Sequence, residues 1–267
     1  MKNIWLVGAS SGIGQSLAFA YAELGHRVFI SARSADTLGT QASKYNEAAG
    51  DNKESSGELV AVPMDVTDSA SIDNAVSHIK SYVDHLDSVI INAGTCEYID
   101  DVFIDINLFR RVMETNLFGA VQVSNSALPL LLNNPQSQLV FVSSSVTYQA
   151  LPRAHAYGGS KAALRYFAEC LKTDIQSQGV DVRLVSPGFV KTPLTDKNDF
   201  EMPFMITSEN AAQRIIDGLQ TNKFDIHFPK RFTIPLKIFS FLPDRLKFKL
   251  LGKMARQGSS TKDESKS

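Results

Sequence analysis

The chain has 267 residues, of which 43% are hydrophobic and 21% are charged, enough for the core of one large α/β domain or two small ones. Its formal net charge of −1 lacks the strong positive field of general nucleic-acid binders, so we expect no nucleic-acid partner. Two cysteines and five histidines show neither a disulfide framework nor metal-ligand spacing, which excludes a disulfide-stapled or metal-centred protein and favours a cytoplasmic location.

From residue 3 onward, apolar runs of strand length alternate with stretches of helical periodicity. The predicted strands are 3–9, 27–32, 59–65, 88–94, 138–144, 181–186 and 224–228. The predicted helices lie near 12–24, 35–48, 69–85, 107–132, 157–178 and 207–220. This alternation, with strands apolar on both faces, is typical of a doubly wound parallel sheet. We therefore predict one α/β domain, with no signal peptide before the first strand and no apolar run near the roughly 18 residues of a membrane span.

The first predicted strand ends in "VGASSGIG", where Gly8, Gly12 and Gly14 stand between a strand and a helix. Glycine leaves room for a sharp turn and for close approach of the backbone to a phosphate. The helix that follows would aim free N–H groups at that phosphate. An ordinary glycine-rich turn is the alternative, but the strand–loop–helix context favours a dinucleotide site.

The end of the second predicted strand, "VFISARS", indicates which dinucleotide binds. Ala32 stands where a carboxylate would hold the ribose 2′-hydroxyl of NAD, and the guanidinium of Arg33 is available for a 2′-phosphate. We therefore expect NADP(H), with NAD(H) as the alternative and an exposed loop arginine as the non-functional reading. Asp65, at the end of the third strand, would either face the adenine or cap the helix near Ser69.

Tyr157 and Lys161 are four residues apart in a predicted helix, so they share one face. An ammonium beside a phenol lowers the phenol pKa, which would prepare Tyr157 for proton transfer. Ser144 ends an apolar strand at the edge where doubly wound sheets bind ligands, although its neighbours Ser143 and Ser145 compete for the same role. For Asn116, the residues alone favour a solvated helix position.

Seven motifs appear in an order that is similar to the short-chain dehydrogenase/reductase family, over residues 1 to about 228. They are "GASSGIG" at 8–14, "MDVTD" at 64–68, "NAG" at 92–94, "ETN" at 114–116, "SSS" at 143–145, "YGGSK" at 157–161 and "SPGFVKT" at 186–192. The resemblance implies a Rossmann-like, seven-stranded parallel sheet as a catalytic domain at 1–228. It also implies a nicotinamide dinucleotide and a catalytic group of Asn116, Ser144, Tyr157 and Lys161.

The resemblance further implies the residues that bind the cofactor. They are Gly8, Ser10, Ser11, Gly12, Ile13, Gly14, Arg33, Asp65, Val66, Asn92, Ala93, Gly94, Tyr157, Lys161, Pro187, Gly188, Val190 and Thr192. In the family pattern Lys161 also holds the nicotinamide ribose, and Asn116 distorts its helix to hold a water for proton relay. Thr192 would meet the nicotinamide carboxamide, with a helix cap or loop threonine as the alternative.

These features predict an NADP(H)-dependent oxidoreductase that moves a hydride between the nicotinamide and a carbonyl or secondary alcohol, with Tyr157 as general acid and base. The alternatives are an NAD-linked alcohol dehydrogenase of the same family and a non-catalytic, dinucleotide-binding regulatory protein. The family resemblance also suggests a homodimer or a homotetramer.

Two segments are expected to wall the substrate pocket, 146–156 and 189–206. The second is rich in apolar side chains, namely Phe189, Phe200, Met202, Phe204 and Met205, which favours an apolar small molecule over a sugar or a phosphorylated substrate. Simple packing of this loop is an equal alternative. Cys96 is read as a small buried residue, and His155 as an exposed loop histidine.

Residues 229–257 carry eight Lys or Arg and one Asp among many Phe, Leu and Ile. Pro243 and Asp244 indicate a helix start. An apolar stripe of Leu242, Leu246, Leu250 and Met254 follows, with basic residues beside it. We favour packing of this extension over the active-site mouth or on a partner subunit; the alternative is peripheral contact with the inner face of a membrane, of which a basic amphipathic helix is typical. Residues 258–267 are predicted to be a disordered tail.

Overall fold

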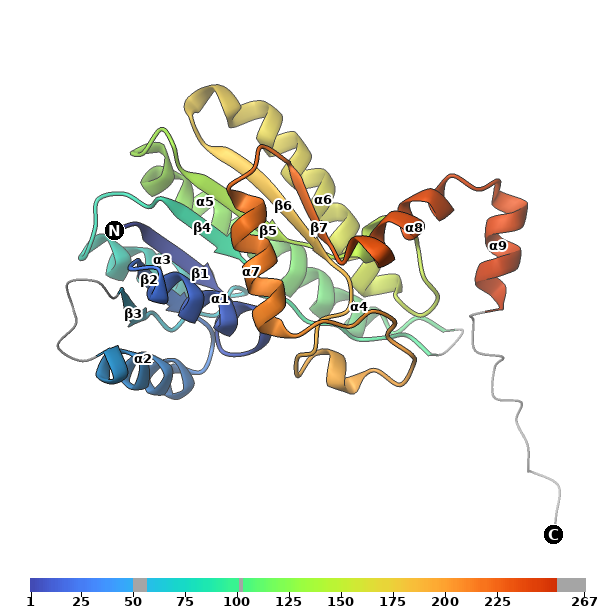
Figure 1. Ribbon diagram of the computed structural model, residues 1–267, viewed down its shortest axis with the longest axis horizontal. Coiled ribbons are helices and arrows are strands. Elements are labelled where there is room, and N and C mark those ends of the chain that lie inside the picture. Colours follow the sequence, from blue (N-terminus) through green and yellow to red (C-terminus); the bar gives the residue numbers. More distant parts are fainter. Residues whose placement is uncertain (50–56, 101–102, 254–267) are drawn as a thin grey trace, which may run out of the picture.

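The computed structural model describes residues 1–49, 57–100 and 103–253. The predicted disordered tail at 258–267, and Met254 of the predicted apolar stripe, lie outside these described residues. The two ends of the described chain lie on different sides of the molecule, as Figure 1 shows.

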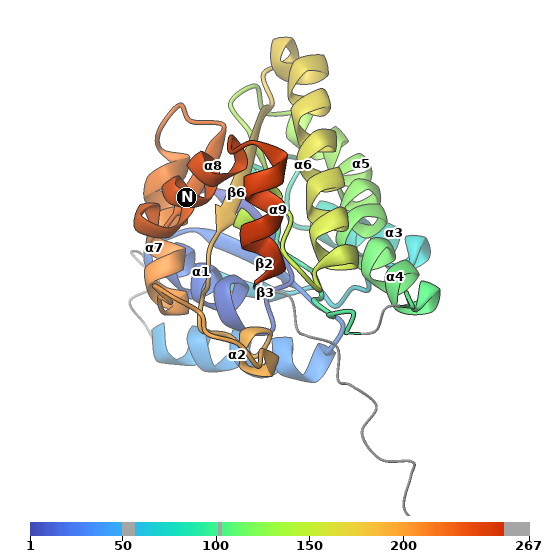
Figure 2. The same ribbon diagram turned by 90° about the vertical axis from the view of Figure 1, so that its right-hand side faces the viewer.

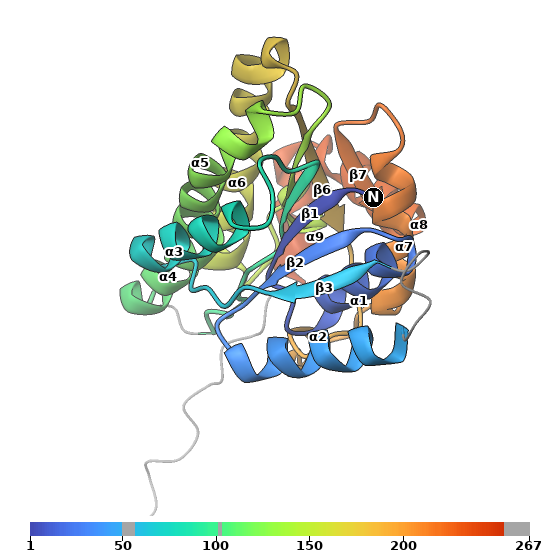
Figure 3. The ribbon, with the colours of Figure 1, turned by 90° about the vertical axis from the view of Figure 1, so that its left-hand side faces the viewer.

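Seven parallel strands form one sheet in the described part of the chain, in the order β3-β2-β1-β4-β5-β6-β7 (Figure 3). The strands are β1 (Asn3–Val7), β2 (Arg27–Ser31), β3 (Glu58–Ala61), β4 (Ser88–Ile91), β5 (Gln138–Val142), β6 (Asp181–Pro187) and β7 (Asp225–Phe228). The predicted single domain with a doubly wound, seven-stranded parallel sheet is therefore confirmed. Most of the predicted strands continue too far at their carboxyl ends, where the chain leaves the ladder to enter loops.

Helices cover both faces of the sheet. They are α1 (Gly12–Glu23), α2 (Ala35–Ala49), α3 (Ser69–Lys80), α4 (Ile106–Met113), α5 (Gly119–Leu132), α6 (His155–Ile175), α7 (Ser208–Leu219), α8 (Lys230–Ser240) and α9 (Asp244–Gly252). Short segments complete them: the π-helical η1 (Glu114–Phe118) and the 3₁₀ turns η2 (Ser145–Thr147), η3 (Gln176–Gln178) and η4 (Thr195–Lys197). Figures 2 and 3 show α1, α2 and α7 on one face and α3, α4, α5 and α6 on the other.

Side-chain alternation along the strands divides the core into two clusters. In β1, Trp5 and Val7 pack in the cluster under α3, α5 and α6, whereas Ile4 and Leu6 pack in the cluster under α1 and α7. Because successive strand residues point to opposite faces, a run of consecutive apolar residues is needed when helices cover both sides. The continuous apolar runs in the sequence have this physical origin.

Two helical predictions need correction. The single helix expected at 107–132 is interrupted by η1, where the backbone widens around residues 114–118. The helix α8 was not predicted, since Pro235 lies inside it and proline normally ends a helix. The predicted helix start at Pro243 and Asp244 agrees with α9.

The strand order reverses beside β1, which pairs with β2 on one side and with β4 on the other. In doubly wound sheets, a ligand crevice opens at such a point, beyond the carboxyl ends of the strands. The loops after β1 and β4 therefore stand at the position where the fold offers a binding site.

Candidate active site

The glycine loop after β1 is shaped by close backbone contacts. Gly8 has a φ of +88°, and a Cβ on it would lie 2.5 Å from the amide nitrogen of Ala93. A Cβ on Gly14 would lie 2.0 Å from the carbonyl oxygen of Gly8, so α1 can approach the loop only at a glycine. Asn92 at the end of β4 donates a 2.8 Å hydrogen bond from Nδ2 to the same carbonyl oxygen. The loop is thus held against the neighbouring strand.

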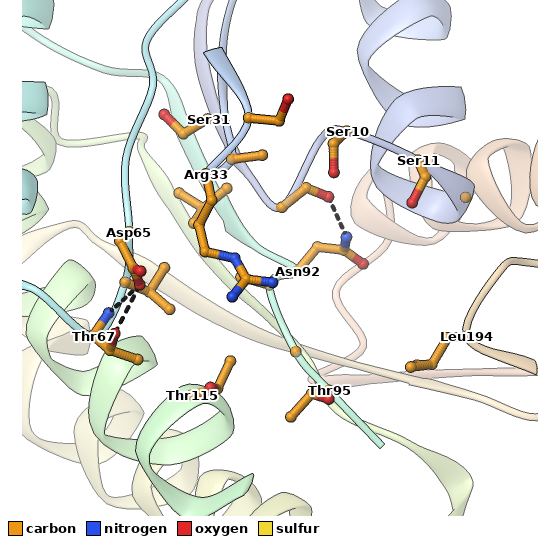
Figure 4. Close-up of a pocket in the computed structure, with 18 of the residues that line it drawn as sticks. Ser10, Ser11, Ser31, Arg33, Asp65, Thr67, Asn92, Thr95, Thr115 and Leu194 are labelled. Carbon is orange, nitrogen blue, oxygen red and sulfur yellow. Dashed lines mark hydrogen bonds between the residues drawn. The ribbon is translucent and has the colours of Figure 1, made fainter. Parts of the chain in front are cut away.

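A cavity of about 830 Å³ opens beside this loop, and Figure 4 shows some of its lining side chains. Many of the predicted cofactor residues line it: Gly8, Ser10, Ser11, Gly12, Ile13, Arg33, Asp65, Val66, Asn92, Ala93, Gly94 and Thr192. The amino end of α1 borders the cavity, and its N-cap residue is Ser11 in an extended conformation. Free N–H groups at a helix start favour an anion such as a phosphate.

The cavity fits a dinucleotide on structural grounds. Its floor is a cradle that a Cβ at Gly8 or Gly12 would fill, because the first would strike Ala93 and the second would lie 2.8 Å from Thr192 Cγ2. Close passage of a pyrophosphate along a backbone requires this absence of side chains. Within the described residues, no group of three His, Cys, Asp or Glu side chains could hold a metal ion.

Arg33 and Asp65 both line the cavity. In Figure 4 the guanidinium of Arg33 extends into the cavity between Asp65 and Asn92. Thr67 donates to Asp65 Oδ1 from its backbone nitrogen at 2.9 Å and from its hydroxyl at 2.8 Å. These hydrogen bonds, together with the charge of Arg33, lower the pKa of Asp65. The alternative that Asp65 caps α3 is wrong, since the capping carboxylate belongs to Asp68.

Several lining residues were missed by the sequence reasoning, chiefly Ser31, Thr67, Thr95, Glu97, Arg111, Glu114, Thr115, Pro193 and Leu194. Arg111 of α4 pairs with Glu97, with a distance of 2.9 Å between Nη2 and Oε2. A charged helix residue normally faces solvent, so its sequence position carried no signal. Thr95 and Glu97, by contrast, follow the "NAG" motif closely and could have been included by their proximity to it.

Asn116 lies in η1 and is fully buried. Its Oδ1 accepts a 2.7 Å hydrogen bond from the Thr95 nitrogen, and its Nδ2 donates to the Thr95 carbonyl oxygen at 2.9 Å. Nδ2 also donates to Ser160 Oγ at 3.0 Å, which links η1 to α6. The solvated-helix interpretation of Asn116 is therefore wrong. The local π-helix lets one side chain join β4's exit loop to the helix that carries Tyr157 and Lys161.

The three consecutive serines after β5 have different surroundings. Ser143 is buried and donates to the carbonyl oxygen of Lys161 at 3.2 Å, and Ser145 is also buried. Ser144 is partly exposed, accepts a 3.2 Å hydrogen bond from the Val146 nitrogen, and bonds to Tyr157. Of the three, Ser144 is the one whose hydroxyl is placed beside the phenol.

Tyr157 and Lys161 occupy adjacent turns of α6. The Lys161 side chain is 4% exposed, its Nζ donates to the Val142 carbonyl oxygen at 2.9 Å, and burial lowers its pKa to about 8. Burial raises the pKa of Tyr157, which the hydrogen bond to Ser144 only partly opposes. The expected lowering of the Tyr157 pKa by a neighbouring ammonium is therefore wrong for this structure, because desolvation of the phenolate is the larger effect.

The catalytic candidates adjoin the cavity at Gly94. A Cβ on Gly94 would lie 3.1 Å from Asn116 Oδ1 and 3.3 Å from Lys161 Nζ. Asn116 and Lys161 therefore stand next to the cavity lining, whereas Ser144 and Tyr157, which bond to each other, are not part of the lining as described. The glycine loop and the proposed proton-transfer group thus meet at one edge of the sheet.

The predicted cofactor residues at the end of β6 and after it differ in their position relative to the cavity. Thr192 lines the cavity opposite Gly12, and its hydroxyl also accepts from the Thr195 nitrogen at 3.4 Å, so both of its sequence interpretations have support. Val190 is buried and forms an isolated bridge with Ile206. Four of the predicted cofactor residues outside the catalytic group lie beyond the lining as described: Gly14, Pro187, Gly188 and Val190.

Aromatic contacts pack the first part of the expected substrate-side segment 189–206, whose link to the segment 146–156 is an ion pair between Arg153 and Asp199. Phe189 and Phe200 have ring centroids 6.0 Å apart, and Tyr98 lies 5.6 Å from Phe200. Phe204 and Met205 remain 46% and 39% exposed. Phe189 and Phe200 therefore pack within the loop, as the packing alternative expects. Phe204 and Met205, by contrast, present apolar surface to solvent.

Two residues near this region were read as non-catalytic. Cys96 is half-buried, burial raises the pKa of its thiol, and the charge of Lys161 opposes that rise. Cys96 therefore lies near Lys161 of the proposed catalytic group, which its interpretation as a small buried residue does not predict. His155 is exposed at the start of α6, as expected.

Fold and cavity together define a dinucleotide-binding α/β protein, and comparison with known proteins specifies its class. The model of the short chain dehydrogenase family matches residues 2–202. The chain belongs to this family, and it is an oxidoreductase acting on CH–OH or C=O groups.

Related sequences include an uncharacterized oxidoreductase of Myxococcus xanthus, 31% identical over 90% of this chain and 92% of that protein. An 11-beta-hydroxysteroid dehydrogenase A of Sesamum indicum is 31% identical over 81% of this chain. A fatty acyl-CoA reductase of Acinetobacter baylyi is 31% identical over 71% of this chain. The matched regions span only 58% and 62% of those two proteins, which are longer.

Solved structures share the fold. A short chain dehydrogenase from Burkholderia cenocepacia in complex with NADP has a TM-score of 0.78 and 22% identity, covering 94% of this chain and 97% of that one. A short chain dehydrogenase/reductase from Burkholderia phymatum in complex with NAD has a TM-score of 0.79 and 18% identity, covering 93% and 94%. At 18% and 22% identity, these likenesses show the fold that the chain shares with both proteins.

Proposed function

We propose that this protein is an NADP(H)-dependent oxidoreductase that interconverts the carbonyl and secondary-alcohol forms of an apolar small molecule. The observation that carries the proposal is the hydrogen bond between Tyr157 and Ser144, one helical turn from Lys161, whose Nζ lies close to Gly94 in the lining of the glycine-loop cavity. When bound there, the cofactor would supply or accept the hydride.

The chain's own residues would manage the proton. In the reductive direction, the phenol of Tyr157 would give its proton to the substrate oxygen as the carbonyl carbon receives the hydride, and solvent would then restore that proton. The Ser144 hydroxyl would donate a hydrogen bond to the same oxygen and stabilise its developing negative charge. Asn116 would position this group, because it joins the Thr95 backbone to Ser160.

The preference for NADP(H) rests on Arg33. Its guanidinium projects into the cavity, and the carboxylate of Asp65, which senses the Arg33 charge, is already bonded to Thr67. A guanidinium grips a 2′-phosphate through charge-assisted hydrogen bonds. An NAD-linked dehydrogenase remains the second candidate, since one structural neighbour was solved with NAD.

The apolar substrate class is supported by the exposed Phe204 and Met205 near the aromatic cluster of Tyr98, Phe189 and Phe200. The names of two relatives, a hydroxysteroid dehydrogenase and a fatty acyl-CoA reductase, point the same way.

Consumption of NADPH and of NADH with a panel of carbonyl compounds tests the proposal. The panel would hold apolar ketones, aldehydes and quinones, with a sugar and a phosphorylated aldehyde as matched polar members. We expect turnover with apolar members and faster turnover with NADPH. Tight NADPH binding without turnover of any member would instead support the non-catalytic regulatory alternative.

Three coarser expectations stay predictions: a catalytic domain at 1–228 with an extension at 229–257 packed on it, a homodimer or homotetramer, and a cytoplasmic location. Sedimentation velocity of the full chain tests the second. Among the described helices, none is long and apolar enough to cross a membrane.

A further inference from the structure

The helices that follow β7 expose an unusual number of large apolar side chains. Phe241 is 87% exposed, Ile238 is 64% exposed and Phe248 is 63% exposed. Ile234, Leu246 and Leu250 are each more than a third exposed. We call the exposed face of residues 230–253 the α8–α9 surface. Ile234, Ile238 and Phe241 recur at the spacing of one helix face, and apolar side chains gathered in this way mark a site of interaction rather than ordinary solvated surface.

The α8–α9 surface is also strongly basic. Residues 229–257 carry a formal charge of +7, so the remainder of the chain carries −8 to give the total of −1. Arg245 and Lys249 are exposed and one turn apart on α9, and Lys253 follows at the same spacing. One end of the molecule is therefore cationic and apolar, whereas the body is anionic.

This surface is continuous with the proposed substrate side. The Arg231 guanidinium lies 4.9 Å from the ring centroid of Phe204, and Phe232 lies 5.2 Å from Phe189. Arg231 and Phe232 belong to α8, and their partners belong to the loop at 189–206. The exposed side chains of Phe204 and Met205 thus extend the apolar patch toward the site.

We propose that the α8–α9 surface, together with Phe204 and Met205, binds the interface of an anionic phospholipid bilayer. Lysine and arginine side chains would contact the headgroups, while the aromatic and aliphatic side chains enter the boundary below them. Such binding would turn the substrate side toward the membrane, a consequence that rests on the proposed function. The membrane binding itself is independent of the proposed function.

The arrangement argues against the other occupants. Figure 1 shows α9 as the outermost helix of the described chain, away from the sheet, so it does not cover the cavity beside the glycine loop. A symmetric contact with a second copy would place the basic residues of one α8–α9 surface against those of another, which like charges oppose. An anionic bilayer satisfies both the charge and the exposed apolar side chains.

Co-sedimentation of the full chain with vesicles tests the proposal directly. We expect binding to vesicles that contain phosphatidylglycerol, and little binding to vesicles of phosphatidylcholine alone. Raising the salt from about 0.1 M to about 1 M shortens the Debye length from about 10 Å to about 3 Å, so the bound fraction should fall. Absence of binding to the anionic vesicles at the lower salt would overturn the proposal.

Paired variants separate the two contributions. Arg245→Gln with Lys249→Gln should weaken vesicle partitioning about 25-fold, since each basic residue near an anionic surface contributes about fivefold. Phe241→Ser with Phe248→Ser should weaken it by at least about tenfold. The matched control is Lys80→Gln with Tyr166→Ser, an exposed basic and an exposed aromatic residue of α3 and α6. Equal partitioning of all three proteins would refute the assigned surface.

Fluorescence gives a second measurement. The chain has one tryptophan, and Trp5 is fully buried, so Phe248→Trp adds a reporter on the α8–α9 surface. Its emission should shift to the blue with anionic vesicles only. No cofactor or substrate is present, so failure of the proposed reaction would leave this result unchanged. Should the Phe241 and Phe248 changes instead dissociate an oligomer that ignores vesicles, the surface would belong to a second copy.

Discussion

Tyr157 and Lys161 stand one helical turn apart. Burial raises the pKa of Tyr157 and lowers the pKa of Lys161, so it favours the neutral form of each side chain. At neutral pH this leaves Tyr157 as a phenol that still holds its proton. Lys161, with a pKa of about 8, remains mostly an ammonium under the same conditions. A protonated phenol suits donation to a carbonyl oxygen, which favours the reductive direction of the proposed reaction.

The buried ammonium of Lys161 gives a prediction for stability against pH. Its folded pKa lies below the ordinary value of 10.5, so below pH 8 the folded state must bury a charge that the unfolded state leaves in water. The free energy of unfolding of the cofactor-free protein should therefore rise between pH 8 and 10, by about 2 to 3 kcal/mol relative to Lys161→Met. Urea denaturation at several pH values measures the difference. Parallel pH profiles for the two proteins would contradict the assignment.

Arg33 gives a prediction for cofactor choice. Arg33→Ala should raise the Kd for NADPH about 10- to 100-fold, because it removes charge-assisted hydrogen bonds to the 2′-phosphate, and should leave the Kd for NADH nearly unchanged. Fluorescence titration of each reduced cofactor measures both constants. Lys80→Ala, an exposed position on α3, is the control. An equal loss for NADPH and NADH would remove the evidence for phosphate recognition.

At the scale of elements, the strands were readable because sheets covered on both faces need unbroken apolar runs such as "NIWLV" in β1. The departures occur where backbone geometry changes without a change in composition. Residues 114–118 have helix-like dihedral angles at their ends, and their sequence "ETNLF" carries no local sign of a π-helix. The helix α8 escaped prediction because Pro235 is tolerated within it.

Asn116 connects three elements, and its loss should therefore affect both stability and activity. Asn116→Ala leaves the Thr95 nitrogen and carbonyl oxygen without this partner in a partly buried place, which should cost about 2 to 3 kcal/mol and most of the turnover. Asn46 offers a matched control, because it makes the same pair of bonds to Leu59 from an exposed position on α2.

Asn46→Ala should cost about 1 kcal/mol and leave turnover intact. Chemical denaturation and NADPH oxidation would be measured on both variants. If Asn116→Ala retained wild-type turnover at its reduced stability, the positioning role of Asn116 would be lost.

Asp225 joins α6, α8 and the turn after Ser144 to β7. Its Oδ2 accepts from the Tyr148 hydroxyl at 2.7 Å, Arg165 Nη1 at 3.0 Å and Lys237 Nζ at 3.4 Å. Although burial would raise it, these partners hold the pKa of Asp225 below its usual value. The carboxylate therefore stabilises the fold above the ordinary aspartate pKa, and this stability is lost as pH falls through the lower folded value.

Asp225→Asn should lower the free energy of unfolding by about 2 kcal/mol at neutral pH, with the difference shrinking in acid. Hydrogen exchange in α8 should become faster, because Lys237 loses its anchor. Asp73→Asn, at an exposed position of α3, is the control. An unchanged exchange rate in α8 would show that other contacts hold this helix.

The whole molecule brings distant motifs to one edge of one sheet. Several distant parts of the chain meet here: the glycine loop, the end of β4, Asn116 and the helix of Tyr157. Gly94 at the end of β4 lies close to both Asn116 Oδ1 and Lys161 Nζ. Topology alone predicts this edge, since parallel strands share the direction of their carboxyl ends. It does not predict how far each side chain is withdrawn from water, and that desolvation is the main cause of the raised pKa of Tyr157.

Two charged residues that line the cavity also could not be predicted from the sequence. The pair of Arg111 and Glu97 borders the cavity, although each residue alone resembles ordinary surface charge. Their pairing depends on how α4 is set against the loop after β4. A sequence pattern carries the period of an element, whereas the orientation of two neighbouring elements depends on packing over the whole molecule.

The central claim is that the Tyr157 phenol transfers the proton to the substrate oxygen. The most direct measurement is the rate of NADPH oxidation by Tyr157→Phe, with the most active carbonyl of the panel and with Tyr166→Phe, an exposed tyrosine of the same helix, as control. We predict a fall of about 10² to 10⁴-fold in turnover, with the Kd for NADPH within about twofold of wild type. A Tyr157→Phe protein that turns over as fast as the control would contradict the account.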